Sequence, residues 1–187
     1  VVNERTESVG GSTVTIYDAG TPDQTLLPRA DGNSWHFMSL PTGIAFSDNF
    51  NFATSTGIKD ANHNGGTFTG PALWSSDPAI YAQPSGGNGS HLDMLHGSPY
   101  CMGIASESAN AFWVFDGWNE TIVRYDFQKD HGPGNDDHAD GLVRRDIEIE
   151  GKRDGNVPSH LVLDKSTGWL CAVDIGNNRV IRLDIHS

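Results

Sequence analysis

The segment from His91 to His96 holds the densest group of potential metal ligands, with Asp93 between the histidines and Cys101 shortly after them. Imidazole is a common ligand of copper and zinc, and sulfur ligands favour Cu(I). On a β-strand, residues 91, 93 and 95 would share one face, which separates the two histidines. In a tight loop or a helical turn, both rings can converge on one ion. The segment therefore indicates a copper site, with zinc as second choice, or else two loop histidines that only form hydrogen bonds.

A second group of candidate ligands lies between residues 130 and 141, which hold four Asp and two His. Here His131 and His138 are further candidates for the transition metal. Asp136, His138 and Asp140 stand at alternate positions before Gly141, which is the spacing of a calcium loop.

A third group, Asp60, Asn62 and Asn64 before Gly65, has the same calcium-loop spacing. Neither loop has the Glu of an EF-hand at its twelfth position, so the sequence excludes an EF-hand. An isolated calcium turn and a simple Asx turn both fit the pattern. Calcium is therefore expected as a structural ion beside copper or zinc.

The elements that position these residues are expected to be β-strands. No stretch keeps helical spacing of apolar residues over a dozen positions, whereas short β-rich runs recur between Gly, Asn, Asp and Pro. The expected strands are 13–17, 44–47, 112–115, 121–127, 142–150, 160–163, 169–173 and 178–185, and a strand-like run also opens at Trp35–His36.

These runs repeat along the chain. A shift of 58 positions places residues 102–127 on 160–185, so that Asp116 matches Asp174, and a weaker copy starts near residue 44. A repeat of this length, read as strand, turn and strand, is typical of a propeller blade. The repeat also places His160 at the start of a first strand, where such strands line a central channel. His160 is thus a candidate metal ligand, or a polar residue that fills the channel.

We expect one all-β domain over residues 1–187. Its repeat units are expected at 40–82, 99–149 and 157–186, with irregular insertions at 56–98 and 128–156. These insertions hold five of the eight histidines, and long loops in compact domains are often functional.

The last repeat resembles an NHL repeat, through Asp174 and the run Gly176, Asn177, Asn178, Arg179. The resemblance implies a β-propeller-like fold. Closed propellers have 4–8 blades, and this length supplies three or four, so the propeller is expected to be incomplete or degenerate.

Two weaker resemblances concern metals. Through the adjacent residues Trp35 and His36, the chain resembles the surface-associated copper proteins of methane-oxidising bacteria. In those proteins two histidines and an oxidised tryptophan bind Cu(I). The NHL-like peptidyl-α-hydroxyglycine lyases, which bind zinc through one histidine per blade together with calcium, also resemble the chain. Thr42 and Met102, however, stand at the positions that match His160.

Composition narrows the class of protein. The net charge is -12, with 18 Asp against 6 Glu and only 12 Lys and Arg, which argues against nucleic-acid binding. No apolar run is long enough to span a membrane. Asp-rich turns and few lysines favour an extracellular, cell-surface or periplasmic location. The chain begins at Val1, so we expect a mature form or a fragment, and the two cysteines allow one disulfide that the sequence does not decide.

Three functions are consistent with these features. The first is a secreted or surface-associated metal-binding protein that holds copper or zinc through histidines, chiefly His91 and His160 with His96 or His138. The second is a metal-dependent propeller enzyme, a lyase or a hydrolase. The third is a propeller that binds other proteins and carries no transition metal.

Overall fold

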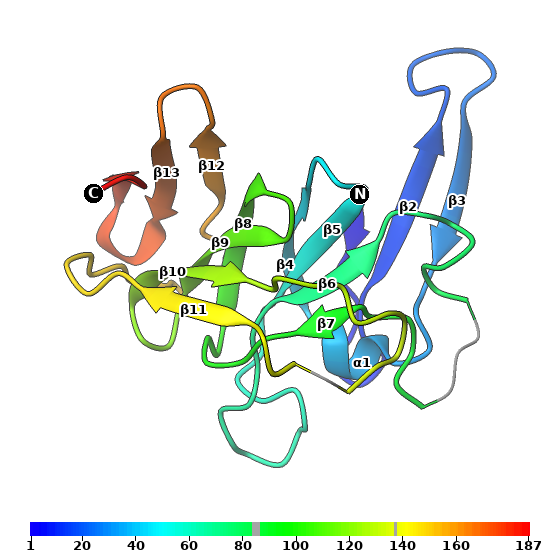
Figure 1. Cartoon of the computed structure of the whole chain (residues 1–187), viewed down its shortest axis with the longest axis horizontal. Helices are drawn as coiled ribbons and strands as arrows, with labels where there is room; N and C mark the ends of the chain where they lie inside the picture. Colours follow the sequence, from blue (N-terminus) through cyan, green and yellow to red (C-terminus); the bar gives the residue numbers. More distant parts are fainter. Residues whose placement is uncertain (84–86, 137) are drawn as a thin grey trace.

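A computed structural model describes residues 1–83, 87–136 and 138–187, and it confirms an all-β chain. Four small antiparallel sheets follow one another along the chain (Figure 1). The first sheet contains β1 (Val2–Asn3), β2 (Ser12–Tyr17) and β3 (Thr25–Arg29). The second contains β4 (Pro41–Phe46), β5 (Asn51–Thr56), β6 (Ala72–Ser75) and β7 (Asp93–Met94). The third contains β8 (Cys101–Ser108), β9 (Ala111–Asp116), β10 (Thr121–Asp126) and β11 (Leu142–Arg145), and the fourth β12 (Leu161–Asp164), β13 (Trp169–Asp174) and β14 (Arg179–Asp184).

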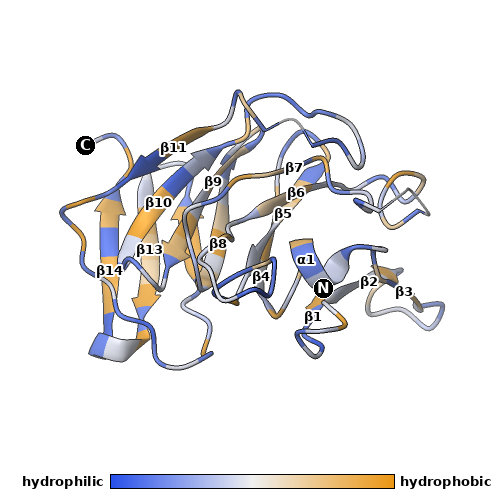
Figure 2. Ribbon diagram, turned by 90° about the horizontal axis from the view of Figure 1, so that it is seen from below, coloured by the Kyte–Doolittle hydropathy of each residue, from blue (hydrophilic) through white to orange (hydrophobic). Residues whose placement is uncertain are grey.

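Each sheet is a meander, in which every strand pairs with the next strand along the chain. The opening strands of successive sheets contact one another, since β1 contacts β4, β4 contacts β8, and β8 contacts β12. Figure 2 shows the sheets side by side from the N-terminal to the C-terminal end. Apolar side chains fill the spaces between sheets: Leu73 and Phe112 belong to one core cluster, and Trp113 and Leu170 to another.

Two glycines allow the opening strands to lie this close. A Cβ on Gly43 in β4 would lie 3.3 Å from Cγ2 of Ile104 in β8. A Cβ on Gly103 in β8 would lie 2.4 Å from the carbonyl oxygen of Ser159, just before β12. Each glycine is the first residue of a Gly-Ile-Ala sequence that occurs in both strands. Close packing between the strands explains why this part of the repeat contains glycine.

The sequence repeat corresponds to equivalent strands in the third and fourth sheets. Strands β9 and β10 lie 58 positions before β13 and β14, residue for residue. The buried carboxylates of Asp116 and Asp174 close the turns after β9 and β13, where they accept hydrogen bonds from the side chains of Asn119 and Asn177. Sequence similarity here reflects the same buried polar turn.

Other expectations need correction. Trp35 and His36 lie in a short helix, α1 (Ser34–Phe37), and not in a strand. The insertion at 56–98 contains β6 and β7, and the insertion at 128–156 contains β11, so neither is wholly irregular. The strand expected over 142–150 ends at Arg145. The thiols of Cys101 and Cys171 are free.

The only other helical element in the described ranges is the three-residue turn η1 (Ile175–Asn177). Within those ranges, no helix has the length and apolar character needed to cross a membrane.

We predict that Gly103→Ala lowers the free energy of unfolding by about 1–3 kcal/mol, because the added methyl meets backbone of the neighbouring sheet. Urea unfolding followed by tryptophan fluorescence measures this loss. Gly32→Ala is the matched control, since a Cβ there meets nothing within 4 Å, and we expect a change within about 0.5 kcal/mol. Equal stability of the two variants would contradict the close approach.

Candidate metal centre

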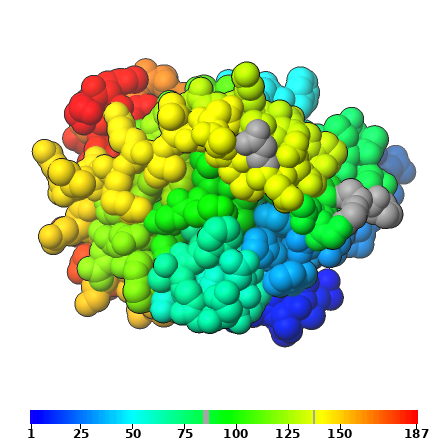
Figure 3. Space-filling view, turned by 60° about the horizontal axis from the view of Figure 1, so that its bottom comes forward, coloured from blue at the N-terminus to red at the C-terminus, as the bar shows by residue number. Residues whose placement is uncertain are grey.

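Histidines from two sheets meet beside β7, the last strand of the second sheet. His91 and His96 flank β7, whereas His131 and His138 come from the β10–β11 loop of the third sheet. Figure 3 shows this loop, in yellow, lying over the green segment that contains β7. Because β7 contains only Asp93 and Met94, both flanking histidines lie outside the strand, and the alternation that would separate their rings does not apply.

His91 is fully buried, and its ring stacks on Phe37 of α1 with centroids 3.6 Å apart. Its Nδ1 lies 2.8 Å from the carbonyl oxygen of Asn88. Since a carbonyl only accepts, Nδ1 carries the proton, and Nε2 of the neutral ring is left with its lone pair. Burial lowers the pKa of His91, and the neighbouring His138 lowers it further. Within the part of the chain that the structure describes, Nε2 has no hydrogen-bond partner, so its lone pair is available to a metal.

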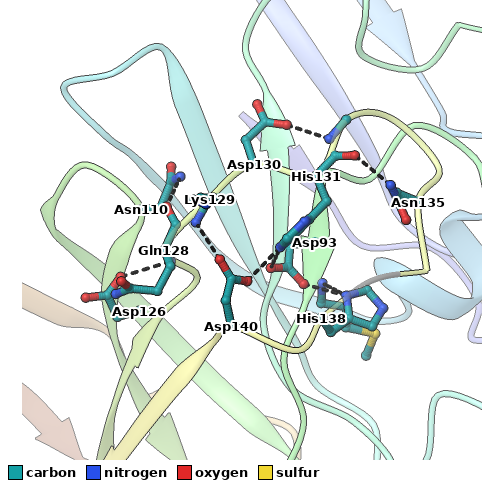
Figure 4. Close-up of polar contacts among 12 residues, drawn as sticks. Asp93, Asn110, Asp126, Gln128, Lys129, Asp130, His131, Asn135, His138 and Asp140 are labelled. Carbon is teal, nitrogen blue, oxygen red and sulfur yellow. Dashed lines mark hydrogen bonds and ion pairs between the residues drawn. The ribbon is translucent and has the colours of Figure 1, made fainter.

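His138 is held by Asp93, whose carboxylate is fully buried (Figure 4). Oδ1 of Asp93 lies 2.5 Å from Nδ1 of His138. The backbone N–H of Met94 also points at this nitrogen, at 3.3 Å. The shorter contact is with a carboxylate, which requires a proton on Nδ1 and leaves Nε2 with its lone pair. A carboxylate behind an imidazole is the usual outer partner of a metal-binding histidine.

His96 completes the group. Its Nδ1 is buried without a hydrogen-bond partner, and its ring lies against Phe68 with centroids 3.8 Å apart. Burial lowers the pKa of His96 to about 4, with smaller effects from His138 and His36. The ring is therefore neutral at pH 7, which is the form that binds metals.

The spacing of the rings fits a shared ion. The centroid of His138 lies 5.9 Å from the centroid of His91 and 5.9 Å from that of His96. With metal–nitrogen bonds of about 2.0 Å, two imidazoles on one ion have centroids about 5 Å apart in a tetrahedral site and about 6 Å apart near linearity. The three predicted ligands His91, His96 and His138 thus lie in one neighbourhood, but among the described residues their ligand nitrogens do not all lie within 4.8 Å of one another.

His131 and Asp140 lie on the other side of Asp93 (Figure 4). Nε2 of His131 lies 2.7 Å from Oδ1 of Asp140 and 4.0 Å from Oδ2 of Asp93. The hydrogen bond from His131 lowers the pKa of Asp140.

The side chains at alternate positions in residues 136–140 do not converge on one place. Oδ1 of Asp136 accepts a hydrogen bond from Asn88, while His138 turns to Asp93 and Asp140 to His131. The calcium spacing in the sequence therefore corresponds here to three separate contacts.

The other calcium candidate, around Asp60, is an Asx-type turn. Its carboxylate accepts backbone N–H groups of Asn62, Asn64 and Gly66. These bonds lower the pKa of Asp60 against the opposing effect of burial, which is the larger single influence. Calcium at this loop stays a prediction.

His160 and Cys101 are not part of the histidine group. His160 is exposed immediately before β12, in the fourth sheet. Cys101 is buried in an apolar cluster with Leu92 and Leu95, and burial raises the pKa of its thiol. The sulfur expected to help bind copper is thus a protonated core side chain.

Comparison with known proteins bears on the fold. No protein-family model and no curated protein matches the sequence. Among solved structures, the chain is similar to an auxiliary nutrient binding protein from Bacteroides ovatus, with a TM-score of 0.55 and 12% sequence identity. The match covers 98% of this chain and 37% of that protein, so the chain spans little more than a third of its length. At this identity the likeness concerns the fold alone.

Sequence reasoning missed the role of Asp93. The residue was noted between the histidines, but nothing in the spacing marked it as the buried partner of a loop that follows much later. The signal that could have found it is a lone Asp in the apolar run Leu92, Met94, Leu95, since a carboxylate buried there needs a partner.

We predict that the metal-free protein loses stability as the pH falls from 7 to 5. The folded-state pKa of His96, about 4, lies below the unfolded value near 6.5, so the unfolded chain takes up a proton in this interval and the folded chain does not. Allowing for the partial exposure of the ring, the loss from His96 is about 1 kcal/mol.

Urea unfolding at several pH values, with a chelator present, measures this slope. His96→Gln should flatten it, whereas His186→Gln, at the exposed C-terminal end, should leave it unchanged. An equal slope in wild type and His96→Gln would show that His96 titrates normally.

Proposed function

We propose that this chain is a transition-metal-binding protein whose site is formed by His91, His96 and His138. One observation carries the proposal. Two buried imidazole nitrogens, Nε2 of His91 and Nδ1 of His96, have no hydrogen-bond partner among the described residues, and the centroids of both rings lie 5.9 Å from that of His138. Buried polar atoms without partners are rare and costly, and a metal ion would satisfy both.

The surroundings of the rings support a metal site over a hydrogen-bonded group. The second nitrogens of His91 and His138 are held by a backbone carbonyl and by Asp93, which fixes each ring and its tautomer. Nε2 of His91 and Nδ1 of His96 receive no hydrogen bond from the described residues. The three histidines match the ligand set that copper and zinc prefer.

Copper is our first choice and zinc the second. The ring spacing of 5.9 Å is closer to the wide angles that low-coordinate Cu(I) accepts than to a tetrahedral zinc site. Aromatic neighbours Phe37 and Phe68 shield two of the rings, and an apolar shell limits solvent access to the metal.

We also propose that the four sheets are blades of an incomplete β-propeller. Their meander order, the contacts between opening strands and the close approach at Gly43 and Gly103 support this arrangement. The metal site then lies at the outer strand of one blade, next to the outer loop of the following blade, and not on the channel-lining strands. A secreted or surface-associated location stays a prediction.

We predict that the protein binds one equivalent of Cu(I) and that His138→Ala and His96→Ala each weaken the affinity. Removing an outer partner of a metal ligand typically lowers the affinity about 10–100-fold, so removing a ligand itself should lower it at least as much. Anaerobic titration against a chromophoric Cu(I) chelator measures this affinity. Asp93→Asn, which keeps the shape but weakens the hold on His138, should cost about 10–100-fold.

His160→Ala is the matched control, because His160 is exposed and lies in a different sheet, and we expect no change in affinity. Circular dichroism of each variant shows whether it is folded. Absence of Cu(I) binding by the wild type, or an equal loss in His160→Ala, would refute the site.

A further inference from the structure

We infer a second cation site, formed by Asp93, His131 and Asp140, that binds a divalent ion of intermediate hardness such as Zn²⁺. It lies next to the proposed histidine site and shares Asp93 with it, but it does not require that site to be occupied. One ligand atom from each of the three residues lies within 4.8 Å of the other two.

The three side chains come from separate parts of the chain. Asp93 belongs to β7, whereas His131 and Asp140 lie near the two ends of the β10–β11 loop (Figure 4). Ligand atoms that share one zinc at about 2.1 Å are about 3.4 Å apart in a tetrahedral site. The observed separations from Nε2 of His131, 2.7 Å to Asp140 and 4.0 Å to Asp93, lie on either side of this value.

The carboxylate of Asp93 supplies an independent indication. The side chain is fully buried, Oδ1 is hydrogen-bonded to His138, and Oδ2 has no hydrogen-bond partner among residues 1–83, 87–136 and 138–187. Oδ2 faces the pair formed by His131 and Asp140. A buried carboxylate oxygen without a donor is costly, and a cation placed between Oδ2 and this pair would satisfy it.

The charge of the cluster also favours a cation. Among ion pairs of described residues, those of Asp93 and Asp140 all involve histidines, with no Lys or Arg. Two carboxylates thus share this place with neutral or weakly basic partners. When a cation binds, His131 gives up the Nε2 proton that it shares with Asp140, and the proton passes to solvent.

The donor set indicates the kind of ion. Two carboxylate oxygens and one imidazole suit Zn²⁺ or Mn²⁺, while Cu(I) prefers nitrogen and sulfur and Ca²⁺ prefers six to eight oxygens. The two neighbouring sites therefore differ in the ions they select, although one carboxylate serves both.

The test uses the full chain with His96→Ala, which removes one ligand of the proposed histidine site and weakens its affinity. Zn²⁺ is added, excess ion is removed by desalting, and metal per chain is measured by elemental analysis. We expect one zinc per chain. Adding Asp140→Asn or His131→Gln should reduce zinc binding at least tenfold, whereas Asp130→Asn, an exposed carboxylate of the same loop, should leave it unchanged.

If both Asp140→Asn and His131→Gln still bind zinc as before, the second site is overturned. The absence of bound zinc in the His96→Ala background would also overturn it. The parallel Cu(I) titration separates this result from the proposed function. Zinc bound through Asp140 without any Cu(I) binding by the wild type supports the second site alone. Cu(I) binding without zinc binding supports the histidine site alone.

Discussion

The buried carboxylate of Asp93 is the constraint on which this part of the molecule depends. It lies on an edge strand between buried apolar neighbours, where an ionised group needs partners. Its hydrogen-bond partner is His138, while His131 lies 4.0 Å from its other oxygen. Both histidines belong to the β10–β11 loop, which folds back over the preceding sheet. A backbone hydrogen bond from Gly134 to His91 holds the same loop in place. The position of this loop and the orientation of the His138 ring follow from these contacts.

The sheets provide a rigid base for this arrangement. A methyl group would collide with the next sheet at Gly103 and would be tightly packed against it at Gly43. Apolar side chains fill the remaining space. Buried Asp116 and Asp174 close equivalent turns in the third and fourth sheets. Edge strand β7 is short and pairs with β6 alone, so its flanking histidines can leave the strand and converge.

The repeat made much of the fold predictable, because strands and turns related by 58 residues reflect the same local packing. The composition of the loops predicted His91, His96 and His138 as ligands, although it could not show that they meet. His160 was expected from its place in the repeat, and a repeat fixes strand position but not the function of one side chain. The calcium site around Asp136 stays a prediction; in this irregular loop the side chains of Asp136, His138 and Asp140 turn to different partners. Such partners are set by tertiary contacts that local spacing does not encode.

The ligands of the proposed sites are far apart in the chain, and Asp93 and His138 are separated by 45 positions. An ion held by both segments would act as a reversible cross-link between two sheets. Its coordination bonds would have the role that a disulfide has in many other proteins. Since such an ion binds the folded chain only, each increase in its free concentration would raise the population of the closed loop. The stability of this junction would then report the metal supply around the protein, even if the ion performed no chemistry.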